Sequence, residues 1–125
     1  MSQLTVSAPT VNSQRLQQSL SDLGVIGAYT DPETQLQGVC RLALSAEDGK
    51  GRNWTTQRMR DLGLSIVVDR IGNVYATRAG QDSSLKPVMV GSHIDSVPTA
   101  GRFDGCLGVL GGLEMIATLN DHKIE

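Results

Sequence analysis

Three side chains with the chemistry of metal ligands lie within the short stretch from Gly91 to Gly105. His93 supplies an imidazole, Asp95 follows two residues later, and Asp104 follows eleven residues after the histidine. Imidazole and carboxylate groups are common ligands of zinc and related divalent ions. A carboxylate beside a ligating imidazole also holds its second nitrogen and raises its basicity. This combination indicates the chemistry of a metal site.

A short strand is expected to deliver His93. Residues 86–91 are apolar at successive positions, which predicts a central strand buried on both faces. Open α/β sheets bind their ligands just beyond the ends of such strands. His93 and Asp95 share one face if the chain stays extended, so we expect their side chains to be neighbours.

A helix is expected to follow the turn that Pro98 and Gly101 produce. It is predicted from Asp104 to about Asp121 and is apolar nearly all round. Asp104 would then lie at the helix start, where a role as N-cap is the alternative to metal binding. Glycines recur on one helix face, which can therefore lie close against a sheet; they are Gly105, Gly108 and Gly112.

The upstream sequence predicts further helices and a hairpin. A helix over 11–23 ends at Gly24, residues 25–37 form turns around Asp31-Pro32, and a second helix covers 34–44. Ser45 is the expected N-cap of a helix over 46–62, with Asp48 completing an imperfect capping box. Strands over 64–69 and 74–77 flank a Gly-Asn turn. Together these elements predict an α/β layer architecture.

Composition excludes several classes of protein. The net charge is −2 and the 11 basic residues are scattered, so no basic stripe indicates nucleic-acid binding. No window has the ~18–20 apolar residues that a membrane span requires. Residues 1–10 form a polar leader without the features of a signal peptide. The two cysteines are far apart, which is typical of reduced thiols in a cytoplasmic protein.

Other residues near the site favour simpler interpretations. The glycines after Asp104 lack the spacing of a dinucleotide or phosphate loop, which argues against nucleotide binding. Cys106 would need a base to act as a nucleophile, and is expected to be a small packed residue. His122 lies in a polar tail and is expected to face solvent.

The stretch from Gly91 to Glu114, with its His-x-Asp and Arg-Phe-Asp-Gly motifs, closely resembles the M20 peptidase superfamily of dinuclear-metal amidohydrolases. The sequence around Ser96-Val97-Pro98 resembles that of one branch in particular: N-carbamoyl-L-amino-acid hydrolases, β-ureidopropionases and allantoate amidohydrolases. The resemblance covers roughly residues 38–121. Its upstream part rests on Arg41, Ser45, Asp48, Gly51-Arg52, Trp54, Met59, Gly63-Leu64, Asp69 and Gly72-Asn73.

This resemblance implies a role for each candidate residue. His93 and Asp104 would bind two divalent ions, Zn²⁺ or Mn²⁺, and Asp95 would support the histidine as a catalytic residue. The metals would activate a water that attacks an amide or ureido carbonyl. The implied substrate is a small molecule, most simply an N-carbamoyl amino acid, and the complete enzyme would be a homodimer.

The resemblance also implies that much of such a site is absent. The implied fold is a partial α/β/α layered catalytic domain, covering residues 11–125, truncated before the lid domain. The Glu-Glu pair and the further histidine ligands of these enzymes have no counterpart here. Two ligands fall short of the three protein ligands typical of catalytic zinc, so weak metal binding without turnover is expected of this chain alone. Ala100 replaces a usual glycine, which would cost about 1 kcal/mol if its φ were positive.

Two alternatives to the carbamoylase function stay open. A dipeptidase or deacylase of the same superfamily would cleave peptides or acyl amino acids. A non-catalytic remnant would instead bind a partner protein through an exposed sheet edge.

Overall fold

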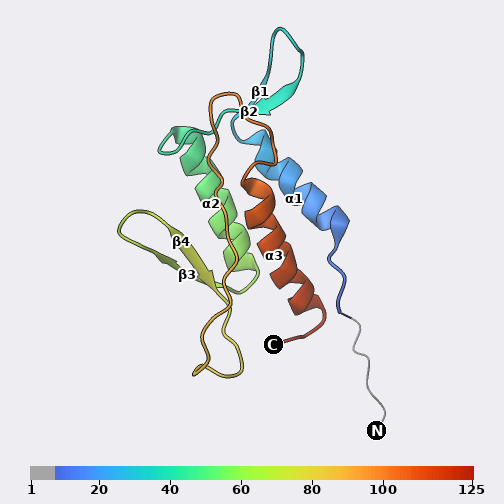
Figure 1. The fold of residues 1–125 in the computed structure, drawn as a ribbon, viewed down its shortest axis with the longest axis vertical. Helices are drawn as coiled ribbons and strands as arrows, with labels where there is room; N and C mark the ends of the chain where they lie inside the picture. The colour runs from blue at the N-terminus through green and yellow to red at the C-terminus, as the bar shows by residue number, and fades with distance from the viewer. Residues whose placement is uncertain (1–7) are drawn as a thin grey trace.

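The computed structural model describes residues 8–125, which form three α-helices and two β-hairpins (Figure 1). The predicted polar leader, residues 1–10, lies mostly outside the described residues. The helices are α1 (Ser13–Val25), α2 (Ala46–Asp61) and α3 (Cys106–Asp121). The strands are β1 (Ala28–Thr30), β2 (Gln37–Val39), β3 (Ser65–Val68) and β4 (Val74–Thr77). The predicted mixture of helices and sheet is thus confirmed, with both sheets two-stranded and antiparallel.

Helix α1 begins and ends two residues later than predicted. Asn12 caps its N-terminus, because its side chain accepts a hydrogen bond from the Arg15 amide. The helix continues through Gly24 and is capped by Ile26. Gly27 follows with φ +80°, and a Cβ there would lie 2.6 Å from the Cys40 carbonyl oxygen. The glycine that the chain needs after α1 is therefore Gly27, where the backbone is left-handed and closely packed.

The prediction of a helix over 34–44 is wrong, because this part of the chain forms a turn and strand β2. Asp31 organises a turn by accepting hydrogen bonds from the Glu33 and Thr34 amides, at 3.0 and 2.7 Å. This turn joins β1 to β2, which pair from Ala28 with Val39 to Thr30 with Gln37. The backbone groups of residues 37–39 are used in pairing, so a helix cannot form there.

Helix α2 and the hairpin after it match the predictions closely. The Ser45 side chain accepts a hydrogen bond from the Asp48 amide, and Asp48 accepts one from the Leu44 amide. Strands β3 and β4 pair antiparallel across the loop at residues 69–73. Asp69 accepts hydrogen bonds from Asn73 in that loop, and Gly72 has φ +96°. Local side-chain chemistry therefore determines both features.

The prediction of a buried central strand over 86–91 is wrong. These residues pair with no strand of the described chain, and Val88 is 97% exposed. The segment runs extended along α3 (Figure 1), where it packs on one side only. A Cβ on Gly108 would meet the Ser92 side chain at 2.7 Å, and one on Gly112 would meet Val90 at 3.2 Å. The predicted close approach to the glycine face is real, but an extended segment, rather than a sheet, makes it.

The core lies where α1 and α3 pack together. Its buried members are Leu20 and Leu23 from α1 and Cys106 and Leu110 from α3. Partly buried apolar side chains surround them: Leu16, Ile26, Trp54, Ile94 and Leu113. No helix among residues 8–125 has the length and apolar character needed to cross a bilayer.

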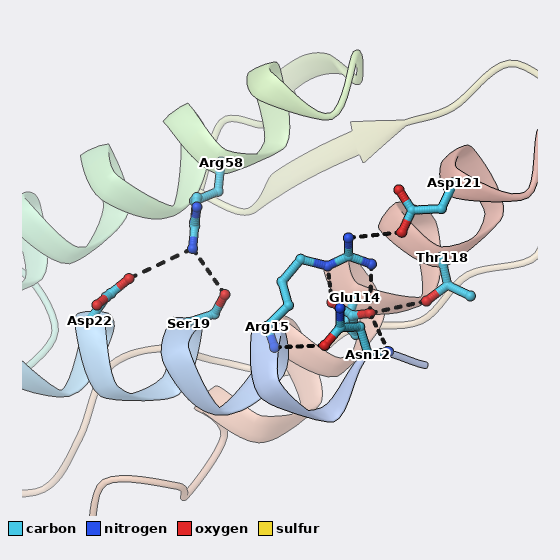
Figure 2. Close-up of polar contacts among 8 residues, drawn as sticks. All are labelled: Asn12, Arg15, Ser19, Asp22, Arg58, Glu114, Thr118 and Asp121. Carbon is cyan, nitrogen blue, oxygen red and sulfur yellow. Dashed lines mark hydrogen bonds and ion pairs between the residues drawn. The ribbon is translucent and has the colours of Figure 1, made fainter. Parts of the chain in front are cut away.

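An ion pair between half-exposed Arg15 and buried Glu114 joins the start of α1 to the middle of α3 (Figure 2). The Glu114 side chain is 4% exposed and accepts two hydrogen bonds from the Arg15 guanidinium, at 2.7 and 2.8 Å. Glu114 also accepts from the Asn12 amide and the Thr118 hydroxyl. Arg15 makes a second ion pair with Asp121. The hydrogen bonds from Arg15, followed by those from Asn12 and Thr118, hold the pKa of Glu114 below its ordinary value despite burial.

The substitution Glu114→Gln is expected to lower the free energy of unfolding by about 2 kcal/mol at pH 7. This is less than the loss for a fully buried pair, because Arg15 is about one third exposed. The stability from ionised Glu114 is fully present above about pH 4.5 and is lost as the pH falls through the lowered pKa. Urea unfolding at pH 7 and pH 3 should therefore show a smaller difference between variant and parent at pH 3. Glu47→Gln, which disrupts an exposed pair with Lys50, is the control and should change stability by under ~0.5 kcal/mol.

Candidate functional site

His93 and Asp95 contact each other as the extended spacing predicts. The Nδ1 atom of His93 lies 3.2 Å from Oδ1 of Asp95 and 3.1 Å from the Asp95 backbone oxygen. The two side chains are 51% and 42% exposed. A proton on Nδ1 would be held by Asp95, which leaves the Nε2 lone pair free to bind a metal.

Gly105 brings the start of α3 against the His93 ring. A Cβ at this position would lie 2.5 Å from Cε1 and 2.6 Å from Nε2 of His93, and 2.5 Å from its carbonyl oxygen. Gly105 also has φ +68°, a left-handed conformation that favours glycine. Asp104 is exposed and directly precedes this contact. The third candidate residue is therefore next to the residue that touches the histidine ring.

Asp104 does not cap the helix. Helix α3 begins at Cys106, its N-cap is Gly105, and no side chain caps it by a hydrogen bond. The carbonyl oxygen of Asp104, rather than its carboxylate, accepts a hydrogen bond from the Cys106 amide at 2.7 Å. The predicted helix start at Asp104 is thus two residues early, and its carboxylate is free of the capping role.

The donors present fit part of a metal site. A half-exposed imidazole and an exposed carboxylate suit Zn²⁺ or Mn²⁺, and the bare Cα of Gly105 leaves room for the ring. Within residues 8–125, however, no three His, Cys, Asp or Glu side chains come together in a group that could hold a metal ion. Further ligands would have to come from residues other than these.

Arg41 is a buried residue at the site that spacing alone does not reveal. Its guanidinium donates to the carbonyl oxygen of Ile94, between His93 and Asp95, at 2.8 Å. It also donates to the Leu23 and Ile26 carbonyl oxygens near the end of α1. An arginine is usually a surface residue, and no sequence pattern here predicts its burial.

Ser96 and Ala100 join the same segment to strand β2. Ser96 Oγ accepts a hydrogen bond from the Arg41 amide at 2.7 Å, and the Ser96 amide donates to the Arg41 carbonyl oxygen. Ala100 exchanges two backbone hydrogen bonds with Val39. Ala100 is not among the residues with positive φ, so alanine is accommodated there without backbone strain.

The other candidates take the roles expected of them. Cys106 is buried and both cysteines are free thiols. Burial raises the pKa of Cys106, partly opposed by the Arg41 charge, so its thiol is neutral near pH 7 and serves as a packed residue. His122 is exposed at the end of α3.

Comparison with known proteins shows what the chain is similar to. The chain is 42% identical over 115 residues to the N-carbamoyl-L-amino-acid amidohydrolase of Rhizobium meliloti, covering 92% of this chain and 26% of that protein. A hydantoinase/carbamoylase family amidase from Burkholderia vietnamiensis has the same fold, with a TM-score of 0.86 and 47% identity. That match covers 98% of this chain and 28% of the solved chain. By sequence and by fold, the chain is similar to a segment of the hydantoinase/carbamoylase family amidases.

The relationship to these amidases covers only part of their length. The chain spans about a quarter of the length of the curated relatives it matches. A ureidoglycolate hydrolase of Oryza sativa is also similar, with 36% identity over 109 residues, 87% of this chain and 22% of that protein. A scan against protein-family models finds no match. The family resemblance inferred from the motifs is therefore confirmed for the segment that this chain represents.

Proposed function

We propose that this chain supplies part of the active site of a metal-dependent amidohydrolase that cleaves the C–N bond of an N-carbamoyl amino acid. The observation that carries the proposal is the His93–Asp95 contact, with Asp104 one residue from the glycine against the ring. Support for the substrate comes from the relatives, several of which are N-carbamoyl-L-amino-acid amidohydrolases at 37–42% identity.

In this proposal His93 would hold a divalent ion through its imidazole, and Asp104 would hold one through its carboxylate. Asp95 keeps the Nδ1 proton and so orients the imidazole. Two Zn²⁺ or Mn²⁺ ions would supply Lewis acidity for the carbonyl and lower the pKa of a water. Further ligands would be needed to complete the site, because two protein ligands are too few for a catalytic zinc. The free thiols Cys40 and Cys106 agree with a cytoplasmic enzyme.

A ureidoglycolate-type substrate is the second candidate. It is favoured by the similarity to the Oryza sativa ureidoglycolate hydrolase. Both substrates present a ureido group whose carbonyl carbon is attacked and whose C–N bond breaks. They differ in the group attached to the ureido nitrogen.

A chimeric enzyme tests the proposal. Residues 8–125 replace the matching segment of the Rhizobium meliloti amidohydrolase, and ammonia release is measured with Mn²⁺ or Zn²⁺ present. We expect hydrolysis of N-carbamoyl amino acids above that of ureidoglycolate, dipeptides and N-acetyl amino acids. Chelation of the metal should abolish turnover, and added Mn²⁺ should restore it. A folded chimera that hydrolyses dipeptides or acyl amino acids instead would contradict the proposed substrate.

A further inference from the structure

Arg41 carries a positive charge in the interior of the protein. Its side chain is 1% exposed, and no ion pair within residues 8–125 involves it. A buried charge is costly unless hydrogen bonds replace the lost water. Neutral hydrogen-bond acceptors therefore have to compensate the cost of burying the Arg41 charge. Their positions show which segments of the chain Arg41 connects.

The acceptors come from three separate parts of the chain. Nη1 donates to the Leu23 and Ile26 carbonyl oxygens at 3.0 and 2.6 Å, near the C-terminal end of α1. The negative end of the helix dipole favours a cation there. Nη2 donates to Cys106 Sγ at 3.2 Å, at the start of α3. Nε donates to the Ile94 carbonyl oxygen at 2.8 Å.

The Ile94 carbonyl belongs to the segment that carries the proposed ligand and its supporting carboxylate. The Cys106 thiol also lies 3.8 Å from this oxygen and can donate to it. Two residues further on, Ser96 makes two hydrogen bonds to the Arg41 backbone. Arg41 thus fixes residues 94 and 96 on either side of Asp95, through its side chain and its main chain.

We propose that Arg41 is a positioning residue that sets the orientation of His93 and Asp95 by fixing the backbone between them. The inference rests on the proposed metal-dependent function. Three nitrogens in one rigid plane donate in diverging directions, which a lysine ammonium on a flexible stem cannot reproduce. The Arg41 side chain is also closely packed, since a Cβ on Gly51 would lie 2.8 Å from Arg41 Cδ and 3.3 Å from Nε.

Arg41→Lys in the 125-residue chain tests the proposal, with Mn²⁺ as a paramagnetic probe. The sequence has only two histidines, so the exposed His122 serves as an internal reference. We expect Mn²⁺ to broaden the proton signals of His93 at lower concentration than those of His122. Arg41→Lys should raise the Mn²⁺ concentration for half-broadening of His93 by at least about tenfold, the usual effect of losing a group that orients a ligand. The matched control is Arg52→Lys, whose guanidinium donates to the Gly72 carbonyl away from the site and which should stay within about twofold.

The outcomes of this experiment distinguish the positioning role of Arg41 from metal binding at His93. A folded Arg41→Lys protein with an unchanged half-broadening concentration at His93 would overturn the proposal. If Mn²⁺ broadens both histidines equally in the parent protein, the proposed metal binding at His93 is rejected. The ¹⁵N signals of His93 in the metal-free protein then test the positioning role of Arg41. Arg41→Lys should then shift the Nδ1–H to Nε2–H tautomer ratio at least twofold, and an unchanged ratio would reject the positioning role.

A second variant covers the case in which Arg41→Lys does not fold. Ser96→Ala removes the hydroxyl that accepts from the Arg41 amide and leaves the guanidinium in place. It should produce the same change at His93, by about threefold or more in the half-broadening concentration or the tautomer ratio. A folded Ser96→Ala protein without that change would overturn the proposal.

Discussion

Replacing His93 with alanine in the chimeric amidohydrolase is expected to lower kcat/KM for N-carbamoyl amino acids by about 10³-fold or more. The proposed ligand is then lost, and with it several kcal/mol of transition-state stabilisation from the metal. Asp104→Asn is expected to have an effect of similar size, because its carboxylate is the other proposed ligand. Ammonia release at saturating metal, together with metal content by atomic absorption, measures both consequences.

Two further variants test whether the loss of activity is specific to the proposed metal ligands. His122→Ala changes an exposed histidine at the end of α3 and should leave kcat/KM within about twofold of the chimera. Asp95→Asn keeps the size of the side chain while weakening its hold on Nδ1, so a loss of about 10–100-fold is expected. Full activity in a metal-loaded His93→Ala enzyme would rule out the proposed ligand.

Gly105→Ala is expected to cause the largest loss of stability produced by a single added methyl group. The new Cβ would lie 2.5 Å from both the His93 ring and the His93 carbonyl oxygen, and the φ of +68° is strained for alanine. Strain and overpacking together should lower the free energy of unfolding by about 2–4 kcal/mol. Because the ring must move, the chimera should also lose activity at temperatures where it stays folded.

Gly111→Ala is the matched control on the same helix. A Cβ at Gly111 meets nothing within 4 Å, and the residue lies in the interior of α3. Alanine should therefore stabilise the helix by about 0.5–1 kcal/mol. Urea unfolding of the two variants compares the same chemical change at a crowded and an open position. Equal effects of the two substitutions would show that Gly105 does not pack against His93.

Features fixed by neighbouring residues were predictable from the sequence. The Ser45–Asp48 cap, the hairpin loop around Gly72-Asn73 and the contact of His93 with Asp95 each depend on residues within five positions of one another. Such short-range chemistry needs no knowledge of the rest of the fold.

Features that depend on distant partners were not predictable. Residues 86–91 have the apolar pattern of a buried strand, but burial on both faces requires neighbours that the described chain provides on one side only. The pairing of β2 with β1 excluded the helix expected over 34–44. The role of Arg41 depends on acceptors 15 to 65 residues away, and nothing in the spacing of those residues predicts it.

The hydrogen bonds of Arg41 also determine how freely the surrounding sequence can vary. Three of its acceptors are backbone carbonyl oxygens, at Leu23, Ile26 and Ile94, and a carbonyl is present whichever side chain a residue carries. Substitutions at those three positions are therefore constrained by packing alone, while the chemical requirement lies at position 41 and at its side-chain acceptor, Cys106. A core redesign could exchange the apolar residues around the guanidinium without removing any of these carbonyl acceptors.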